Sequence, residues 1–302
     1  MRTMAGRGAV VALVILLAPG TLCAQGGDGT FHLRSGGLER SYLLHAPAGS
    51  GARPLVVLLH GRLGTGAGMA KMTHFDAVAD RAGILVAYPD GWRRSWNDGR
   101  PGTPAHRRQV DDVSFILAMI DDIGRRMPVD PRRVYVAGMS NGGFMTERLA
   151  CEAGERFAAV AVDVATLSDS LASTCRLPRP VPAIFFHGTA DPLVPYGGGR
   201  MGDRGSGLSV DETVATWARW NGCAPSPVME SLPDTAREGI QVTRRTWPRC
   251  RDGADVVAYK FDGGGHAWPG GTQYLPARFV GRVSRNVDAS EEIGRFFERH
   301  IR

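Results

Sequence analysis

The sequence predicts an α/β fold with a mostly parallel central sheet and helices on both faces. Apolar, β-rich runs alternate along the chain with segments in which apolar residues recur at helical spacing. Several of these runs are hydrophobic throughout, as is typical of strands that are covered on both faces. The alternation favours a doubly wound sheet, in which functional residues lie at the carboxyl ends of the strands.

The positions of these runs define the individual elements. The predicted strands, in chain order, are residues 40–47, 54–61, 83–91, 133–140, 157–165, 181–188 and 255–263. The predicted helices are residues 69–81, 111–127, 141–151, 210–221 and 289–300. Asp111 and Asp112 stand at the start of the second helix, where acidic residues cap the backbone, so we expect them to have a structural role.

An export signal is predicted over residues 1–25. Two arginines precede an apolar run over residues 9–18, and Pro19 and small residues follow. The run is too short to cross a bilayer, and no later segment approaches the ~20 apolar residues that a span requires. We therefore expect a secreted protein, extracellular or periplasmic, without stable membrane insertion. Residues 26–302 are expected to form a single domain.

The charge pattern argues against two classes of partner. The formal net charge is +6, and all but two of the basic residues are arginines. These arginines are scattered among acids instead of forming a stripe with aromatic residues, so nucleic acid is not an expected partner. The sequence implies no obligate protein partner.

Four cysteines follow the predicted signal, and an even number in an exported chain favours disulfides. Three pairings are possible. We favour Cys151 with Cys175 and Cys223 with Cys250, because each pair is close in sequence, 24 and 27 residues apart. Free buried thiols are the alternative. A metal site is disfavoured because no CxxC spacing occurs.

Ser140 stands in the stretch VYVAGMSNGGF, between a predicted strand and a predicted helix. Gly138 and Gly142 complete a GxSxG motif. It lies between a strand and a helix, which is the context in which this motif indicates a nucleophilic serine. So tight a turn requires small neighbours and lifts the hydroxyl into an exposed position. We interpret Ser140 as a nucleophile. A glycine-rich turn with a capping serine is the alternative.

A neutral serine hydroxyl needs a base within hydrogen-bond reach, and the base needs an orienting carboxylate. On sheets that carry such an elbow, the chain order is serine, acid, histidine. His266 lies in the glycine-rich loop FDGGGHAWPGG after a strand and is the predicted base. His300, near the chain end on a polar helix, is interpreted as a surface residue.

Asp191 is the predicted acid, because FFHGTADPLVPY places it just beyond a strand. Asp163 ends another predicted strand and is a rival. Asp211 and Glu212 begin a helix, where a capping role is the better explanation. His187 precedes Asp191 at a strand end, and we expect it to hydrogen-bond within the turn.

The tetrahedral oxyanion of acyl transfer needs two preorganised N–H donors. One is expected from the backbone of Asn141, directly after the nucleophile. The other is expected from the backbone of Arg62 in LLHGRLGTG, and His60 is expected to pack beneath that loop. Since both donors are main chain, the side chain at position 62 is free to vary.

These motifs together resemble a known family. The segments LLHGRLGTG, YPDGW…SWNDG, VDDVSFI, VYVAGMSNGGFMTERLACE, FHGTADPLVPYGG and GGGHAWPGG resemble those of the secreted polyhydroxybutyrate depolymerase-like esterases, including LpqC-type proteins, which are related to feruloyl esterases. The resemblance runs from about residue 30 to the C-terminus. It implies an α/β-hydrolase fold, hydrolysis of carboxylic esters through an acyl-enzyme, and no metal or organic cofactor. By position it places the catalytic triad on Ser140, Asp191 and His266, and the pattern of paired cysteines is also similar.

The chain also departs from the family pattern. Only 36 residues follow His266, whereas polymer-degrading members commonly carry a separate substrate-binding domain. We therefore consider soluble esters, oligomers and feruloylated sugars as substrates in addition to the polymer. Arg62 stands where many members carry a cysteine.

Three residues are predicted to contact substrate. Trp268, two residues after His266, is expected to line the pocket or to pack its own loop. Trp96 and Asn97 lie on a loop beyond a strand end, where substrate contacts are expected.

The sequence thus predicts a serine ester hydrolase acting on hydroxyalkanoate oligoesters or polyesters, or on related esters. A feruloyl or acetylxylan esterase is the alternative substrate assignment. A serine peptidase and an acyltransferase use the same triad. A non-catalytic binding protein on the same scaffold is the alternative of a different class.

Overall fold

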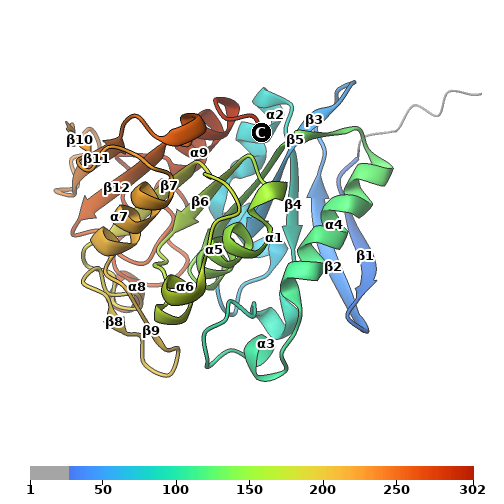
Figure 1. Ribbon diagram of the computed structural model, residues 1–302, viewed down its shortest axis with the longest axis horizontal. Coiled ribbons are helices and arrows are strands. Elements are labelled where there is room, and N and C mark those ends of the chain that lie inside the picture. The colour runs from blue at the N-terminus through green and yellow to red at the C-terminus, as the bar shows by residue number, and fades with distance from the viewer. Residues whose placement is uncertain (1–26) are drawn as a thin grey trace, which may run out of the picture.

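A computed structural model describes residues 27–302, so the predicted signal peptide, residues 1–25, lies outside the described residues. One ten-stranded sheet runs through the molecule in the order β1-β2-β4-β3-β5-β6-β7-β12-β11-β10, and β8 pairs separately with β9 (Figure 1). The strands are β1 Gly29–Ser35, β2 Leu38–His45, β3 Arg53–Leu59, β4 Leu85–Pro89, β5 Val129–Met139, β6 Ala159–Asp163, β7 Ala183–Gly188, β8 Gly199–Arg200, β9 Ser206–Gly207, β10 Val228–Leu232, β11 Gln241–Trp247 and β12 Val256–Asp262.

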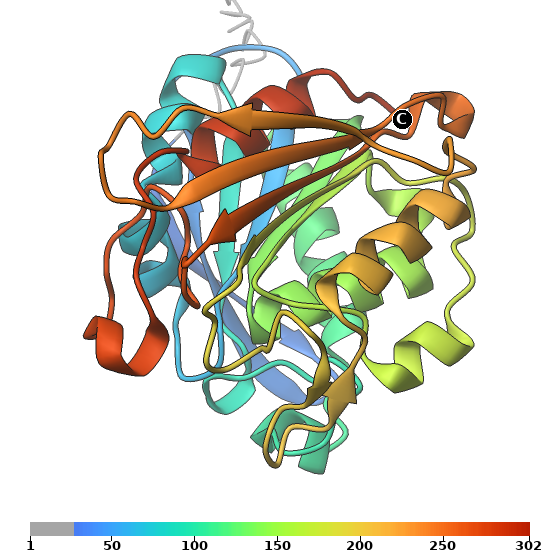
Figure 2. The same ribbon diagram turned by 90° about the vertical axis from the view of Figure 1, so that its left-hand side faces the viewer.

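Helices cover both faces of this sheet, as Figure 2 shows. They are α1 Gly66–Thr73, α2 Phe75–Ala82, α3 Pro104–Arg107, α4 Asp112–Arg126, α5 Asn141–Ala153, α6 Asp169–Thr174, α7 Val210–Trp220, α8 Ala277–Val280 and α9 Ala289–Glu298, with short 3-10 turns η1 Trp92–Arg94, η2 Gly154–Arg156 and η3 Arg251–Gly253. One apolar cluster joins the sheet to α4, α5 and α7, and a second joins its other face to α1, α2 and α9. The predicted α/β class is confirmed.

The six central strands, from β4 to β12, are mutually parallel. Beyond them, at both edges of the sheet, each strand pairs antiparallel with its neighbour. Strand β3 shows why its sequence is hydrophobic throughout. Leu55, Val57 and Leu59 face the first cluster, whereas Val56 and Leu58 face the second. Because successive side chains of a strand point to opposite faces, both sets are buried.

Two parts of the element prediction need correction. The single helix predicted over residues 69–81 is two helices, because His74 adopts a left-handed conformation with φ 54° and its N–H bonds back to Ala70. The antiparallel edge strands β1, β10 and β11 were not predicted. Every residue of β1 and β10 is at least partly exposed, and β11 buries only Val242 and Trp247, so the hydrophobic runs that mark the central strands are missing there.

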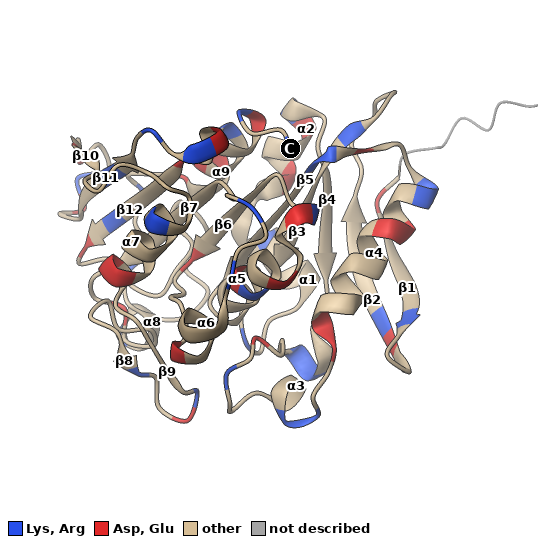
Figure 3. Ribbon diagram, viewed as in Figure 1, with Lys and Arg blue, Asp and Glu red and all other residues tan. Residues whose placement is uncertain are grey.

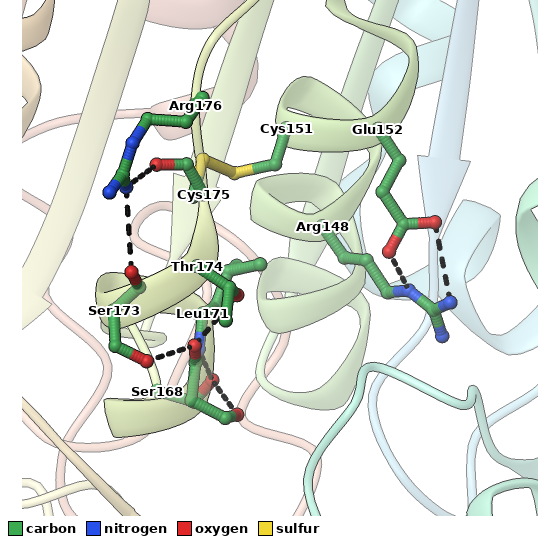
Figure 4. Close-up of a disulfide and its surroundings, with 10 residues drawn as sticks. Arg148, Cys151, Glu152, Ser168, Leu171, Ser173, Thr174, Cys175 and Arg176 are labelled. Carbon is green, nitrogen blue, oxygen red and sulfur yellow. Dashed lines mark hydrogen bonds and ion pairs between the residues drawn. A yellow bond between two sulfur atoms is a disulfide. The ribbon is translucent and has the colours of Figure 1, made fainter.

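Both favoured disulfides are present. Cys151 in α5 pairs with Cys175 just after α6, and Cys223 after α7 pairs with Cys250 after β11. Figure 4 shows the first pair, which fixes the C-terminal half of α5 to the neighbouring α6 segment beside the Arg148–Glu152 ion pair. Two disulfides in one domain are typical of proteins that fold in an oxidising compartment.

Basic and acidic residues are interspersed over the visible elements in Figure 3. None of the helices described within residues 27–302 combines the length and the apolar character that crossing a membrane requires.

Candidate active site

Ser140 stands at the sharp corner between β5 and α5. Its backbone angles, φ 55° and ψ −121°, lie in a sparsely populated region, and its N–H donates to the carbonyl of Asp163 at 2.9 Å. A Cβ added at Gly138 would lie 2.3 Å from the carbonyl oxygen of Gly142, and one at Gly142 would lie 2.2 Å from that of Leu59. Both glycines are therefore required sterically, and the surrounding main chain holds the serine in its strained conformation.

Asp191 and His266 meet at the carboxyl ends of β7 and β12, which are adjacent parallel strands. The Oδ2 atom of Asp191 lies 2.7 Å from Nδ1 of His266, and both side chains are 2% exposed. The other carboxylate oxygen accepts hydrogen bonds from the N–H groups of Leu193 at 2.7 Å and Val194 at 2.9 Å. The carboxylate is thus fixed by its own turn and orients the imidazole.

The loop that carries His266 is itself fixed by close backbone contacts. The N–H of His266 donates to the carbonyl of Val280 at 2.5 Å. A Cβ added at Gly265 would lie 2.3 Å from the Cα of Gly281, so this loop and the end of α8 can approach only because both positions are glycine. This approach explains the glycine directly before His266.

Ser140 and His266 line the same cavity, which has a volume of about 580 Å³. Their side chains are not hydrogen-bonded to each other among the described residues. Catalytic hydrogen bonds of this kind are often long without substrate and tighten when it binds. The structure therefore brings the three residues of the predicted triad to one edge of the sheet and joins two of them directly.

The two predicted oxyanion donors belong to residues that line a cavity together with Ser140. A Cβ added at Gly61 would contact the side chain of Ser140, 3.4 Å from its Cβ and 4.0 Å from its Oγ, so the loop after β3 passes directly against the nucleophile. Within residues 27–302, neither the N–H of Arg62 nor that of Asn141 donates to a protein acceptor. Both groups remain candidate donors to a substrate oxygen.

His60 supports this loop from below, as expected. Its Nε2 accepts a hydrogen bond from the N–H of Gly91 at 2.9 Å, so Nδ1 carries the proton and donates to the carbonyl of Gly61 at 2.7 Å. Burial lowers the pKa of His60, which favours this neutral form. The His60 ring also packs on Trp96, with the ring centroids 4.9 Å apart.

The predicted substrate contacts of Trp96 and Asn97 are not supported. Trp96 is fully buried and donates its indole N–H to the carbonyl of His60 at 2.8 Å. Asn97 is also buried, and its amide donates to the carbonyl of Val110. The Asn141 side chain bonds to the backbone N–H of Trp96 at 2.8 Å, so this segment supports the elbow from behind.

Trp268 is likewise a packing residue. It is fully buried, and its indole N–H donates to the Ser290 hydroxyl at 3.0 Å, away from the cavity. Of the two roles expected for Trp268, packing is therefore the one that its contacts favour.

The rival acid Asp163 has a different environment from that of Asp191. Both of its carboxylate oxygens are buried without a hydrogen-bond partner. Burial, together with the negative charge of Asp191, raises the pKa of Asp163 well above its ordinary value. This shift favours the neutral form of Asp163, which supports the elbow through its backbone carbonyl. Of the other two rivals, Glu212 forms a capping box with Ser209 at the start of α7, and Asp211 lies in the same turn.

The alternative histidines are both engaged elsewhere. His187 is buried, its Nε2 lies 2.6 Å from the carbonyl of Ala165 on the neighbouring loop, and burial lowers its pKa to about 4. This contact differs from the sequence prediction, which was a hydrogen bond within the turn of His187 itself. His300 is buried too, contrary to expectation, with Nδ1 2.7 Å from the carbonyl of Phe296.

The cavity walls contain residues that the motifs did not reveal. Leu63, Met69, Met72 and Leu275 give the large cavity a mostly apolar lining, and Tyr274 lies beside His266. A second, smaller cavity also touches Ser140 and is lined by Arg62, Arg100 and Arg204 among others, and of these arginines Arg62 and Arg204 line both cavities. Arg62 and Leu63 belong to the segment LLHGRLGTG, but no motif pointed to the other lining residues, because their convergence on the cavity depends on tertiary packing. No group of three or more potential metal ligands gathers within residues 27–302.

Comparisons with known proteins place this geometry in a family. Residues 40–176 match the family model described as Esterase PHB depolymerase. NocK of Nocardia uniformis subsp. tsuyamanensis, an inferred esterase, is 34% identical over 271 residues, covering 84% of this chain and 78% of NocK. Feruloyl esterase B of Piromyces equi is 30% identical over 72% of this chain, and the match spans 40% of that longer protein.

A solved structure extends the likeness to the fold. The acetyl xylan esterase from Aspergillus awamori matches with a TM-score of 0.55 at 18% identity, over 79% of this chain and 94% of that chain. At this identity the match speaks for the fold alone. Together with the level of identity to NocK, these findings show that the chain belongs to the PHB depolymerase esterase family and has the α/β-hydrolase fold.

Proposed function

We propose that the protein is a serine carboxylic-ester hydrolase in which Ser140 is the nucleophile, His266 the general base and Asp191 the orienting acid. The observation that carries the proposal is the hydrogen bond that Nδ1–H of His266 donates to Asp191, at the wall of a cavity that Ser140 also lines. A buried carboxylate that holds Nδ1–H leaves Nε2 of the imidazole free to accept the serine proton.

The reaction follows from these positions. His266 takes the proton of Ser140 as Oγ attacks the ester carbonyl, and the backbone N–H groups of Arg62 and Asn141 stabilise the resulting oxyanion. His266 then gives its proton to the leaving alcohol, which yields the acyl-enzyme. A water molecule, deprotonated by His266, then attacks the acyl-enzyme. His266 returns the proton to Oγ of Ser140, and the carboxylic acid is released.

The proposed substrates are hydroxyalkanoate oligoesters or polyesters, as the family description suggests. Feruloyl or acetylxylan esters are the alternative, which the names of two relatives in sequence favour, feruloyl esterase B and a bifunctional acetylxylan esterase/xylanase. We further propose that residues 1–25 are removed as a signal peptide and that residues 26–302 are a single catalytic domain, extracellular or periplasmic. The two disulfides support this compartment.

A turnover panel tests the proposal. Purified protein is assayed on short p-nitrophenyl esters, hydroxybutyrate oligomers, methyl ferulate and acetylated xylan, with Ser140→Ala as the control. Hydrolysis of at least one ester class, abolished in the variant, is the expected result. Preferential amide cleavage would indicate a peptidase, and transfer to an added alcohol that outpaces hydrolysis would indicate an acyltransferase. A wild-type protein inert on every ester would favour a binding function.

A further inference from the structure

The segment of residues 96–98 contacts both parts of the chain that supply the proposed oxyanion donors. The indole N–H of Trp96 donates to the carbonyl of His60 at 2.8 Å, two residues before Arg62. The backbone N–H of Trp96 donates to Oδ1 of Asn141 at 2.8 Å, and the carbonyl of Trp96 accepts from Nδ2 of Asn141 at 3.1 Å. One buried segment thus connects the loop of one donor to the residue that carries the other.

Asp98, at the end of this segment, is held by a buried ion pair. Its carboxylate accepts from Nη2 of Arg100 at 2.6 Å, from Nε at 3.1 Å and from the backbone N–H of Arg100 at 2.9 Å. The Arg100 guanidinium also stacks on Phe144 in the first turn of α5, 3.2 Å from the ring centroid. A buried ion pair is weak evidence for a stabilising role, because the cost of removing two charges from water offsets their attraction. The contacts of this pair point instead to a role in orienting the groups around it.

The Asp98 carboxylate determines which way the Asn141 amide faces. Nδ2 of Asn141 donates to Oδ2 of Asp98 at 2.7 Å. Because an ionised carboxylate can only accept hydrogen bonds, the NH2 group of Asn141 must face Asp98, and its oxygen then faces the N–H of Trp96. A reversed amide would place its oxygen against the carboxylate and its NH2 group against a backbone N–H. The carboxylate therefore selects a single orientation.

The Asn141 side chain is short, so fixing its amide also restrains the main chain that carries it. Only two side-chain torsions separate the amide from Cα. The peptide group between Ser140 and Asn141 is held at its other end, because the carbonyl of Ser140 accepts from the N–H of Phe144 at 2.9 Å. The N–H of Asn141 donates to no protein acceptor within residues 27–302. Contacts on both sides thus set the direction of a donor that is available to substrate.

We propose that Asp98 is a positioning residue of the oxyanion site: through the Asn141 side chain it holds the backbone N–H of Asn141 in the direction that stabilises the tetrahedral oxyanion. The inference rests on the proposed ester hydrolysis and concerns the same site. Preorganised donors act mainly on the transition state, because they are aimed at the charge that develops there. Loss of the Asp98 carboxylate therefore lowers kcat and leaves KM nearly unchanged.

The test assays Asp98→Asn on p-nitrophenyl butyrate, with active sites counted by the endpoint of fluorophosphonate labelling. The expected kcat is about 10- to 100-fold below that of wild type, because a donor is misdirected and not removed, and KM stays within about 2-fold. A trifluoromethyl ketone inhibitor, to whose carbonyl Oγ of Ser140 adds, carries an oxyanion of the same kind. Its Ki should rise by about the factor by which kcat/KM falls.

A double-mutant cycle tests whether Asp98 acts through Asn141. Asn141→Ala removes the amide but keeps the backbone N–H and the ion pair of Asp98 with Arg100. It should lower kcat at least as much as Asp98→Asn does. The combined variant Asp98→Asn/Asn141→Ala should lose no more than Asn141→Ala alone, because both changes break the same connection.

A second variant at position 98 separates positioning from stability. Asp98→Asn leaves Arg100 buried without its partner charge, whereas Asp98→Asn combined with Arg100→Met removes both charges and is expected to fold. This neutral variant should show a loss of kcat and a rise in Ki of about the same size as Asp98→Asn.

Asp130→Asn is the matched control. Asp130 likewise accepts from the backbone N–H two residues on, that of Arg132, and from an arginine side chain, that of Arg133. It lies near the start of β5, at the end of the strand opposite to the elbow. Its replacement should leave kcat, KM and Ki unchanged.

The outcomes separate this inference from the proposed function. Wild-type kcat in either variant at position 98 or in Asn141→Ala, a change confined to KM, or losses that multiply in the combined variant with Asn141→Ala would overturn the inference and leave the esterase assignment intact. A wild-type protein inert on every ester of the panel would overturn the proposed function, and the inference with it.

Discussion

Replacing Glu147 by glutamine is expected to make folding stability less dependent on pH. Glu147 lies in α5, two helical turns after Ser140, and is completely buried. Neither carboxylate oxygen has a hydrogen-bond partner. Burial raises the pKa of Glu147 from 4.5 to about 8, so the folded protein keeps this group protonated at neutral pH.

The sign of the effect follows from the proton balance. Between about pH 4.5 and pH 8 the unfolded chain releases this proton while the folded protein retains it, so the free energy of unfolding falls as pH rises through that window. At 1.36 kcal/mol per pKa unit, the free energy of unfolding is lower at pH 8 than at pH 4.5 by at most about 5 kcal/mol because of this group. Glu147→Gln cannot ionise, so its stability advantage over wild type should grow from near zero at pH 4.5 to a few kcal/mol at pH 8.

Urea unfolding monitored by tryptophan fluorescence at pH 5, 6.5 and 8 measures this difference. Groups other than Glu147 titrate equally in both proteins and cancel. Glu152→Gln is the matched control, because Glu152 lies on the same helix but is exposed and pairs with Arg148, so its effect should stay within about 1 kcal/mol at each pH. An advantage of Glu147→Gln that is the same at pH 5 and pH 8 would refute the reasoning.

Three further predictions concern the site and its scaffold. Asp191→Asn should lower kcat on p-nitrophenyl butyrate by about 10³- to 10⁴-fold with little change in KM, because the amide no longer orients the imidazole, and an effect on KM alone would contradict the assigned role. Gly142→Ala should lower the free energy of unfolding in urea by about 1–3 kcal/mol, since the new Cβ would lie 2.2 Å from a carbonyl oxygen of β3. The control Gly124→Ala has open space around the new Cβ and should not destabilise the protein. Replacing Cys151 and Cys175 together by serine should lower the free energy of unfolding by about 3 kcal/mol, as expected for a closed loop of this length, and an unchanged urea midpoint would count against that estimate.

The central strands and the elbow could be predicted from the sequence because their signals are local. The second half of strand β5 is apolar on both faces, and the glycines around Ser140 are required by close backbone contacts at the turn. Asp191 and His266 followed from chain order and from their positions after strands. Edge strand β10 could not be found in this way, because four of its five residues are exposed.

The pocket walls could not be predicted for a different reason. Trp96 and Trp268 have the right residue type and lie near the right loops, but the direction of each side chain depends on the tertiary path of its loop, and both point into the core. Arg204 lies outside the motifs and lines a cavity with Ser140 because of the path of the β8–β9 loop. The spacing of residues along the sequence predicts neither the direction of these side chains nor the path of this loop.

Labelling with a fluorophosphonate, followed by peptide mapping, tests most directly whether Ser140 is an activated nucleophile. The predicted result is a single modified serine, Ser140, with labelling abolished in Ser140→Ala and strongly slowed in His266→Ala. Equal labelling of wild type and Ser140→Ala, or modification of a different serine, would contradict the account.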